Sequence, residues 1–157
     1  MVTGHYAKGL LRRQEIIDVA TDAFSRAGFE GTSIVAIAAD AGISRAGLLH
    51  HFESKEELLM AVLTSREDAD RQIFIDSGSR ARGGVGVLRG MVRLAQANET
   101  RPGLVRLFVV LGAESVEPSH PAHEYFRAHY ERILTGTTAA LDSARTHERL
   151  RADIDPQ

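Results

Sequence analysis

The stretch over residues 32–59 constrains the fold of this chain more than any other part of the sequence. Its apolar residues recur at spacings of three and four, as they do along one face of an α-helix. The pattern is interrupted at Gly42 and again at Glu53. It therefore predicts two short helices, over about 34–41 and 45–52, and a longer helix directly after them.

A hydroxyl side chain stands before each of these helices: Thr32 or Ser33 before the first, Ser44 before the second, Ser54 before the third. Such hydroxyls accept hydrogen bonds from the free N–H groups of a first helical turn, and the sequence SKEE after the second break is a capping box. A helix, a tight turn and a short capped helix are typical of a helix-turn-helix. The helix over 45–52 would be ~13 Å long, which suits the major groove of DNA.

An amphipathic helix is predicted before this motif, over about 10–27. Gly28 follows at the position where a left-handed residue often ends a helix, and this motif would place Phe29 against Phe24. Residues 1–9 have no clear period and are predicted to form a flexible basic arm. The apolar stripe of the helix consists of Leu10, Ile16, Ile17, Ala20, Ala23, Phe24 and Ala27.

The rest of the chain also has helical periodicity and no strand pattern, so the predicted fold class is all-α. Pro102 and Pro121 suit the first position of a helix. The helix that begins at Pro102 is apolar nearly all round, which is typical of a central helix. After the helix-turn-helix, the predicted helices cover about 55–75, 87–98, 102–115 and 121–144, and a glycine-rich loop is expected over 77–86.

Composition limits the possible functions. The chain has no cysteine, which excludes a disulfide framework, a thiolate zinc site and a cysteine nucleophile. No secretory segment and no apolar run of membrane-spanning length occur, so we expect a cytoplasmic protein without a membrane partner. The net charge is −2, so DNA binding would need a local cluster of positive charge. Residues 1–14 provide one, with His5, Lys8, Arg12 and Arg13 and no acid.

The sequence over residues 12–63 resembles the N-terminal domain of the tetracycline-repressor (TetR/AcrR) family. The residues that carry the resemblance are Phe24, Gly28, Thr32, Ile37, Ala38, Ala41, Gly42, Ser44, His51, Phe52, Lys55 and Leu58. The resemblance implies a one-component transcriptional regulator, usually a repressor, with a helix-turn-helix domain over 10–56 and a helical ligand-binding domain over 57–157. Family members usually end with two further helices that form the dimer interface. We therefore expect the second domain to be incomplete after Gln157; the alternative is that the helices predicted over 102–115 and 121–144 form the dimer interface.

The resemblance further implies a homodimer on a palindromic DNA operator, released when a small apolar or amphipathic molecule binds the second domain. Thr32 and Lys55 would contact phosphate, His50 would reach the backbone, and Ser44 and Arg45 would contact DNA at the start of the recognition helix. Arg12 and Arg13 would follow the backbone or enter the minor groove. The predicted DNA-binding set is Arg12, Arg13, Thr32, Ser33, Ser44, Arg45, Ala46, Gly47, Leu49, His50 and Lys55.

The recognition helix departs from the family at three positions. Family members often have Gly, Thr and Tyr where this chain has Ala46, Gly47 and Leu49, so base readout is left largely to Arg45. This departure motivates an alternative: a helical small-molecule-binding protein with weak or lost operator binding. An oligomerisation module that acts through protein partners is a third possibility. The operator, ligand, regulated genes and sign of regulation stay open.

The ligand pocket is expected among apolar residues of the second domain, as in other helical bundles. The candidates are Leu88, Met91, Phe108, Leu111, Phe126 and Tyr130. His50 and His51 would diverge on their helix, and the group His120, His123 and Glu124 matches no metal-binding motif. No catalytic triad or phosphate loop stands out. The sequence therefore predicts no enzyme, no cofactor and no metal.

Overall fold

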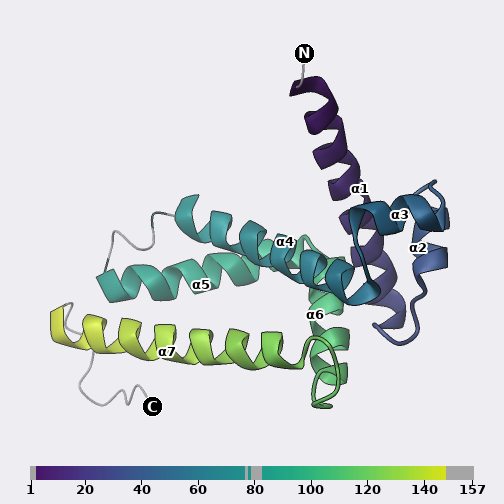
Figure 1. Cartoon of the computed structure of the whole chain (residues 1–157). Helices are drawn as coiled ribbons and strands as arrows, with labels where there is room; N and C mark the ends of the chain where they lie inside the picture. The colour runs from purple at the N-terminus through teal and green to yellow at the C-terminus, as the bar shows by residue number, and fades with distance from the viewer. Residues whose placement is uncertain (1–2, 77, 79–82, 148–157) are drawn as a thin grey trace. The chain divides into compact units, whose positions relative to one another are not determined.

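A computed structural model describes residues 3–76, 78 and 83–147, and the residues so described form seven α-helices and no strand (Figure 1). The predicted all-α fold class is confirmed. The helices are α1 (Thr3–Ala27), α2 (Ile34–Asp40), α3 (Arg45–His51), α4 (Lys55–Asp76), α5 (Gly83–Glu99), α6 (Pro102–Glu114) and α7 (His123–His147).

The chain divides into two compact units. The first contains the described residues up to Arg66 together with Pro102–His123, and the second contains the described residues of Glu67–Arg101 and those from Glu124 onward. The expected division near residue 56 differs from this one, because α6 packs on α1 and so belongs with the helix-turn-helix.

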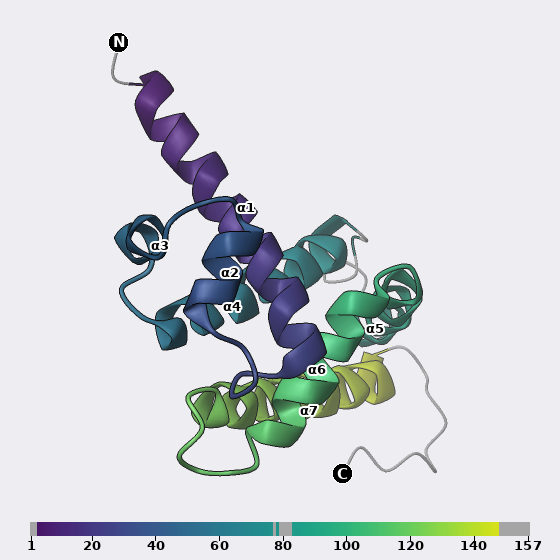
Figure 2. The same ribbon diagram turned by 90° about the vertical axis from the view of Figure 1, so that its right-hand side faces the viewer.

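The core of the first unit lies between α1, α6 and the short helices. The apolar stripe of α1 is buried at Ile16, Ala20 and Phe24, and Leu107 and Leu111 of α6 are fully buried. Figure 2 shows α6 beside α1. Because full burial of one such aliphatic or aromatic side chain contributes ~1.5–3 kcal/mol, this packing fixes the helix on which the DNA-binding motif stands.

Helix α1 begins at Thr3, where the sequence predicted an irregular arm up to residue 9. The first turns project beyond α2 and α3 in Figures 1 and 2. Leu10 and Leu11 are 52% and 66% exposed. Residues 7–11 are all exposed, so no buried apolar period marks this part of the helix in the sequence. The predicted stripe was therefore wrong at Leu10, and also at the exposed Ala27.

Helix α6 is buried on one side only. Leu107 and Leu111 are buried against α1, but Val105 is 40% exposed and Val109 is 66% exposed. The prediction of a central helix was therefore wrong for this chain, because within its own unit α6 packs along a single face.

Helix α5 begins at Gly83, inside the predicted glycine-rich loop. Gly84 is buried, and a Cβ atom added to it would lie 2.0 Å from the backbone oxygen of Ala140 in α7. This glycine therefore permits a close approach of two helices of the second unit. Pro121 is not the first residue of α7, which begins at His123. None of the described helices is long and apolar enough to cross a membrane.

Candidate DNA-binding interface

Three serine side chains cap the helices of the motif, as predicted. The hydroxyls of Ser33, Ser44 and Ser54 each accept a hydrogen bond from an N–H three residues ahead, at 3.1, 3.0 and 3.0 Å. Ser33, rather than Thr32, caps α2. The caps begin α2, α3 and α4 at defined residues and therefore fix the motif's geometry. The donors are the N–H groups of Ala36, Gly47 and Glu57.

Thr32 is 7% exposed and stabilises the turn between α1 and α2. Its hydroxyl donates to the backbone oxygen of Gly28 at 2.6 Å, and its N–H donates to the oxygen of Phe29 at 3.2 Å. Both donors are used inside the fold. The expected phosphate contact by this residue is therefore not supported, because a buried and satisfied donor would have to break its hydrogen bond to reach DNA.

The turn between α2 and α3 is built as the sequence indicated. Gly42 has φ of +65°, a left-handed conformation that is easiest for glycine. Ile43 is half-buried, and its N–H donates to the backbone oxygen of Ala38 at 2.9 Å. The side chain of Ile43 thus packs between α2 and α3 in the turn that joins them.

Helix α3 has one buried and one exposed face. Leu48, and Phe52 at its C-cap, are fully buried. Arg45 and His50 are exposed, as are Ser44 and Ala46, while Gly47 and Leu49 are half-buried. This division gives α3 an inner and an outer face. An exposed face on a short capped helix is the arrangement that can enter a major groove, and its one guanidinium, that of Arg45, suits bidentate contact with guanine.

Two cations beside α3 lie over aromatic rings. The guanidinium of Arg13 lies 4.2 Å from the ring centroid of Phe52, and the Nζ of Lys55 lies 4.1 Å from that of Phe29. Such contacts contribute ~0.5–1 kcal/mol when exposed and limit the rotamers of the long side chains. Each contact therefore favours one position of a positive charge beside α3.

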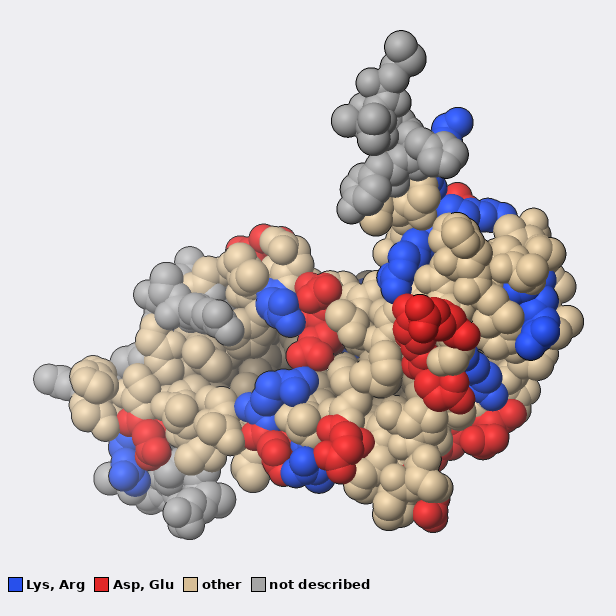
Figure 3. Space-filling model, in the orientation of Figure 1, with Lys and Arg blue, Asp and Glu red and all other residues tan. Residues whose placement is uncertain are grey.

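Arg12 is held by polar contacts instead. Its Nη2 donates to the backbone oxygen of Ala41 at 3.0 Å, and its Nη1 lies 2.5 Å from Glu15. Arg13 also lies 3.7 Å from a carboxylate oxygen of Glu57. Figure 3 shows Lys and Arg side chains on the part formed by α1 to α3, next to a group of Asp and Glu side chains. The interface is therefore mixed in charge, and attraction to phosphate depends on a few placed cations.

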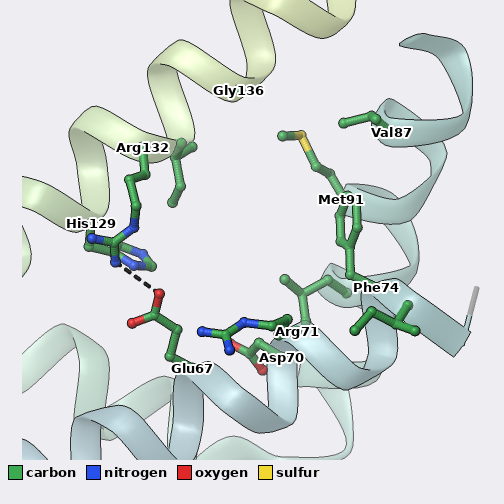
Figure 4. A pocket seen from close by; sticks show the side chains of 12 residues that line it. Glu67, Asp70, Arg71, Phe74, Val87, Met91, His129, Arg132 and Gly136 are labelled. Atoms are coloured by element: carbon green, nitrogen blue, oxygen red, sulfur yellow. Dashed lines mark hydrogen bonds and ion pairs between the residues drawn. The ribbon is translucent and has the colours of Figure 1, made fainter. Parts of the chain in front are cut away.

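A cavity of about 420 Å³ lies in the second unit, between α4, α5 and α7 (Figure 4). Of the predicted pocket residues, Met91 lines it. Leu88, Phe126 and Tyr130 do not, and Tyr130 is 57% exposed. Phe108 belongs to the first unit, where Arg66 lies over its ring at 3.6 Å, and so does Leu111.

The sequence did not identify the charged residues that line this cavity. Arg71 lies on α4, and His129 and Arg132 lie on α7. No local pattern separates a charged residue at a cavity from one in open solvent. Within the described ranges, no group of three His, Asp or Glu residues is arranged to hold a metal ion.

Residues 16–62 match the family described as "Bacterial regulatory proteins, tetR family". The chain is 39% identical to the HTH-type transcriptional repressor AcnR of Corynebacterium glutamicum over 80 residues, which are 51% of this chain and 40% of AcnR. The chain thus spans less than half the length of that repressor.

Two further proteins are similar over most of the chain. The HTH-type transcriptional repressor Rv1474c of Mycobacterium tuberculosis is 32% identical over 173 residues, which cover 92% of this chain and 89% of that protein. The crystal structure of AibR in complex with isovaleryl coenzyme A and operator DNA matches with a TM-score of 0.66 and 25% identity, over 92% of this chain and 77% of AibR. The family match at the helix-turn-helix and the extent of the similarity to Rv1474c show that the chain belongs to the tetR family of bacterial regulatory proteins.

Proposed function

We propose that this chain is a ligand-responsive transcriptional repressor that binds a palindromic DNA operator as a homodimer and leaves it when a small molecule binds its second unit. The observation that carries the proposal is the two-sided recognition helix. Leu48 and Phe52 anchor α3 in the core, and Arg45 and His50 extend from its exposed face. The cations of Arg13 and Lys55 flank this helix and suit backbone phosphates.

Helix α4 supports the ligand-responsive part of the proposal. Its first residue, Lys55, follows the cap next to the recognition motif, and its later residues Asp70 and Phe74 line the cavity. A ligand that binds the cavity therefore contacts the same continuous helix that begins at the DNA-binding motif. AibR, which has a similar fold, was crystallised with both an acyl-coenzyme A and operator DNA.

A gel-shift titration with operator DNA tests the proposal. Arg45→Ala and Lys55→Ala should each weaken binding, while circular dichroism should show an intact helical fold. The control is Arg127→Ala, an exposed arginine of the second unit whose loss should leave the affinity unchanged. Unchanged affinity in the Arg45 and Lys55 variants would contradict the proposed interface.

The alternative is a helical small-molecule-binding protein with weak or lost operator binding. The composition of the α3 face favours it, because Ala46, Gly47 and Leu49 offer little to a base edge. The two proposals differ in the DNA recovered by binding-site selection. A regulator would enrich an inverted repeat, whereas this alternative predicts that no sequence is enriched while a ligand still binds the cavity.

A further inference from the structure

The cavity of the second unit has an apolar part and a charged part, as Figure 4 shows. In this view the labelled side chains of Met91 and Val87 lie on one side and those of His129 and Arg132 on the other. The volume of about 420 Å³ is within the range of small-molecule sites. A ligand that fills it would therefore be amphipathic. The apolar lining consists of Phe74, Ile75, Val87, Met91, Leu94 and Ile133.

The two acids that line the cavity already have guanidinium partners. Asp70 pairs with Arg101 at 2.5 Å, and the side chains of this pair are only 15% and 23% exposed. Glu67 pairs with Arg132 at 2.9 Å, and Figure 4 shows this contact at the charged end. To bind Asp70, a ligand cation would have to displace Arg101 and leave its half-buried charge without that partner, and at Glu67 it would compete with Arg132.

The cation Arg71 is held much less firmly. Its guanidinium pairs with Asp68 at 3.1 Å, a residue that does not line the cavity, and both side chains of the pair are more than half exposed. Exposed pairs at this spacing contribute little to stability, because water solvates each partner when they separate. An anion can therefore replace Asp68 as the partner of Arg71 at a small cost in free energy, because water then solvates the carboxylate of Asp68.

We propose that the cavity binds an amphipathic carboxylate, with its apolar tail between α4, α5 and α7 and its carboxylate on Arg71 and Arg132. This inference rests on the proposed ligand-responsive function and names the chemical class of the ligand. Arg132 has guanidinium donors beyond the one that bonds to Glu67, and an arginine fork matches a carboxylate in geometry. The ligand anion would thus join an existing ion pair without breaking it.

Three probes of equal tail length separate the possible head groups: decanoate, decylamine and 1-decanol. Binding of each to the 157-residue chain is measured by isothermal titration calorimetry, without DNA. Decanoate should bind about two- to ten-fold more tightly than 1-decanol, because Arg71 and Arg132 are both more than half exposed and water weakens each contact, and decylamine should bind no better than 1-decanol. Decylamine or 1-decanol binding as tightly as decanoate would overturn the proposal, and so would no binding by any probe.

Two variants test the position of the carboxylate. Arg71→Gln and Arg132→Gln should each lower decanoate affinity toward that of 1-decanol and leave 1-decanol binding unchanged. A variant that merely damaged the cavity would weaken both probes. The control is Arg127→Gln, because Arg127 is also ion-paired on α7 but does not line the cavity. Equal decanoate affinity in all three variants would contradict the assigned site.

A third variant tests whether the tail occupies this cavity. Gly136 lines it, and a Cβ added there has no neighbouring atom within 4 Å. Gly136→Leu should therefore fold normally, gain helix propensity and reduce binding of decanoate and 1-decanol alike. Undiminished binding of decanoate and 1-decanol would show that the tail does not occupy this cavity.

Failure of this inference is distinguishable from failure of the proposed function. Operator binding is measured separately by gel shift, so a chain that binds an operator but prefers decylamine would refute only the ligand class. A chain that binds decanoate in the cavity but enriches no DNA sequence would refute the regulatory function and leave the ligand class standing.

Discussion

The carboxylate of Glu114 accepts a hydrogen bond from the backbone N–H of Phe29 at 2.7 Å. This hydrogen bond joins the last residue of α6 to the turn after α1. The Nε2 of His120 lies 3.6 Å from the same carboxylate, and the rings of His120 and Phe29 meet edge to face with centroids 5.3 Å apart. Lys55, the first residue of α4, lies over the ring of Phe29. The turn that supports the recognition motif is therefore held by Glu114.

Replacement of Glu114 should destabilise the chain. Glu114→Ala removes the acceptor of a partly buried N–H, and we expect a loss of ~1–3 kcal/mol in the free energy of unfolding. Urea denaturation followed by circular dichroism measures it. Glu117→Ala is the control, because Glu117 is exposed and should change stability by less than ~0.5 kcal/mol. Equal effects of the two substitutions would contradict a specific role for Glu114.

Gly28 should tolerate alanine less well than Gly42. Both have positive φ, +72° and +65°, so alanine costs ~1–2 kcal/mol of backbone strain at either position. A Cβ on Gly28 would in addition lie 1.8 Å from a carboxylate oxygen of Glu114, whereas one on Gly42 has nothing within 4 Å. Comparison of the two unfolding free energies isolates this clash. Equal losses would show that Glu114 moves away freely.

Gly84 and Gly136 should respond to alanine with opposite sign. Both lie in helices of the second unit, and alanine gains ~1 kcal/mol of helix propensity at Gly136 in the interior of α7 but less at Gly84 in the first turn of α5. Gly136→Ala should therefore raise the midpoint of thermal unfolding. Gly84→Ala should lower it, because its Cβ would lie 2.0 Å from the oxygen of Ala140. A rise in both midpoints would mean that α5 and α7 can move apart at Gly84 without a loss of stability.

Lys55 and Arg45 should differ in how they affect DNA binding. Lys55→Ala should weaken binding to all sequences about equally and lower the slope of log affinity against log salt by about 1. Arg45→Ala should instead reduce discrimination between operator variants by ~1–3 kcal/mol. Fluorescence anisotropy at several salt concentrations measures both quantities. Identical salt and sequence effects of the two substitutions would refute the division of roles.

The sequence predicted the local features of the motif well. The caps at Ser33, Ser44 and Ser54 involve donors only three residues away, and the turn at Gly28 packs Phe24 against Phe29, with ring centroids 6.0 Å apart. Interactions of this range are encoded by spacing alone.

The non-local features could not be predicted in this way. Glu114 and Phe29 are 85 positions apart, and no periodicity connects them. Gly84 resembled a loop residue because only the structure shows Ala140 against it. Likewise, Arg71 and Arg132 line one cavity from two helices, and a single sequence gives no sign that they meet. Such contacts depend on how distant helices pack.

Selection of double-stranded DNA from a random library by the purified chain tests the central claim most directly. Two recognition helices related by a twofold axis read half-sites about one helical turn, ~34–36 Å, or a multiple of it apart. We predict that sequencing of the bound DNA will show one enriched inverted repeat, and that Arg45→Ala will lose base preference within each half-site. A bound pool with no enriched repeat would contradict the claim that this chain is a sequence-specific DNA-binding regulator.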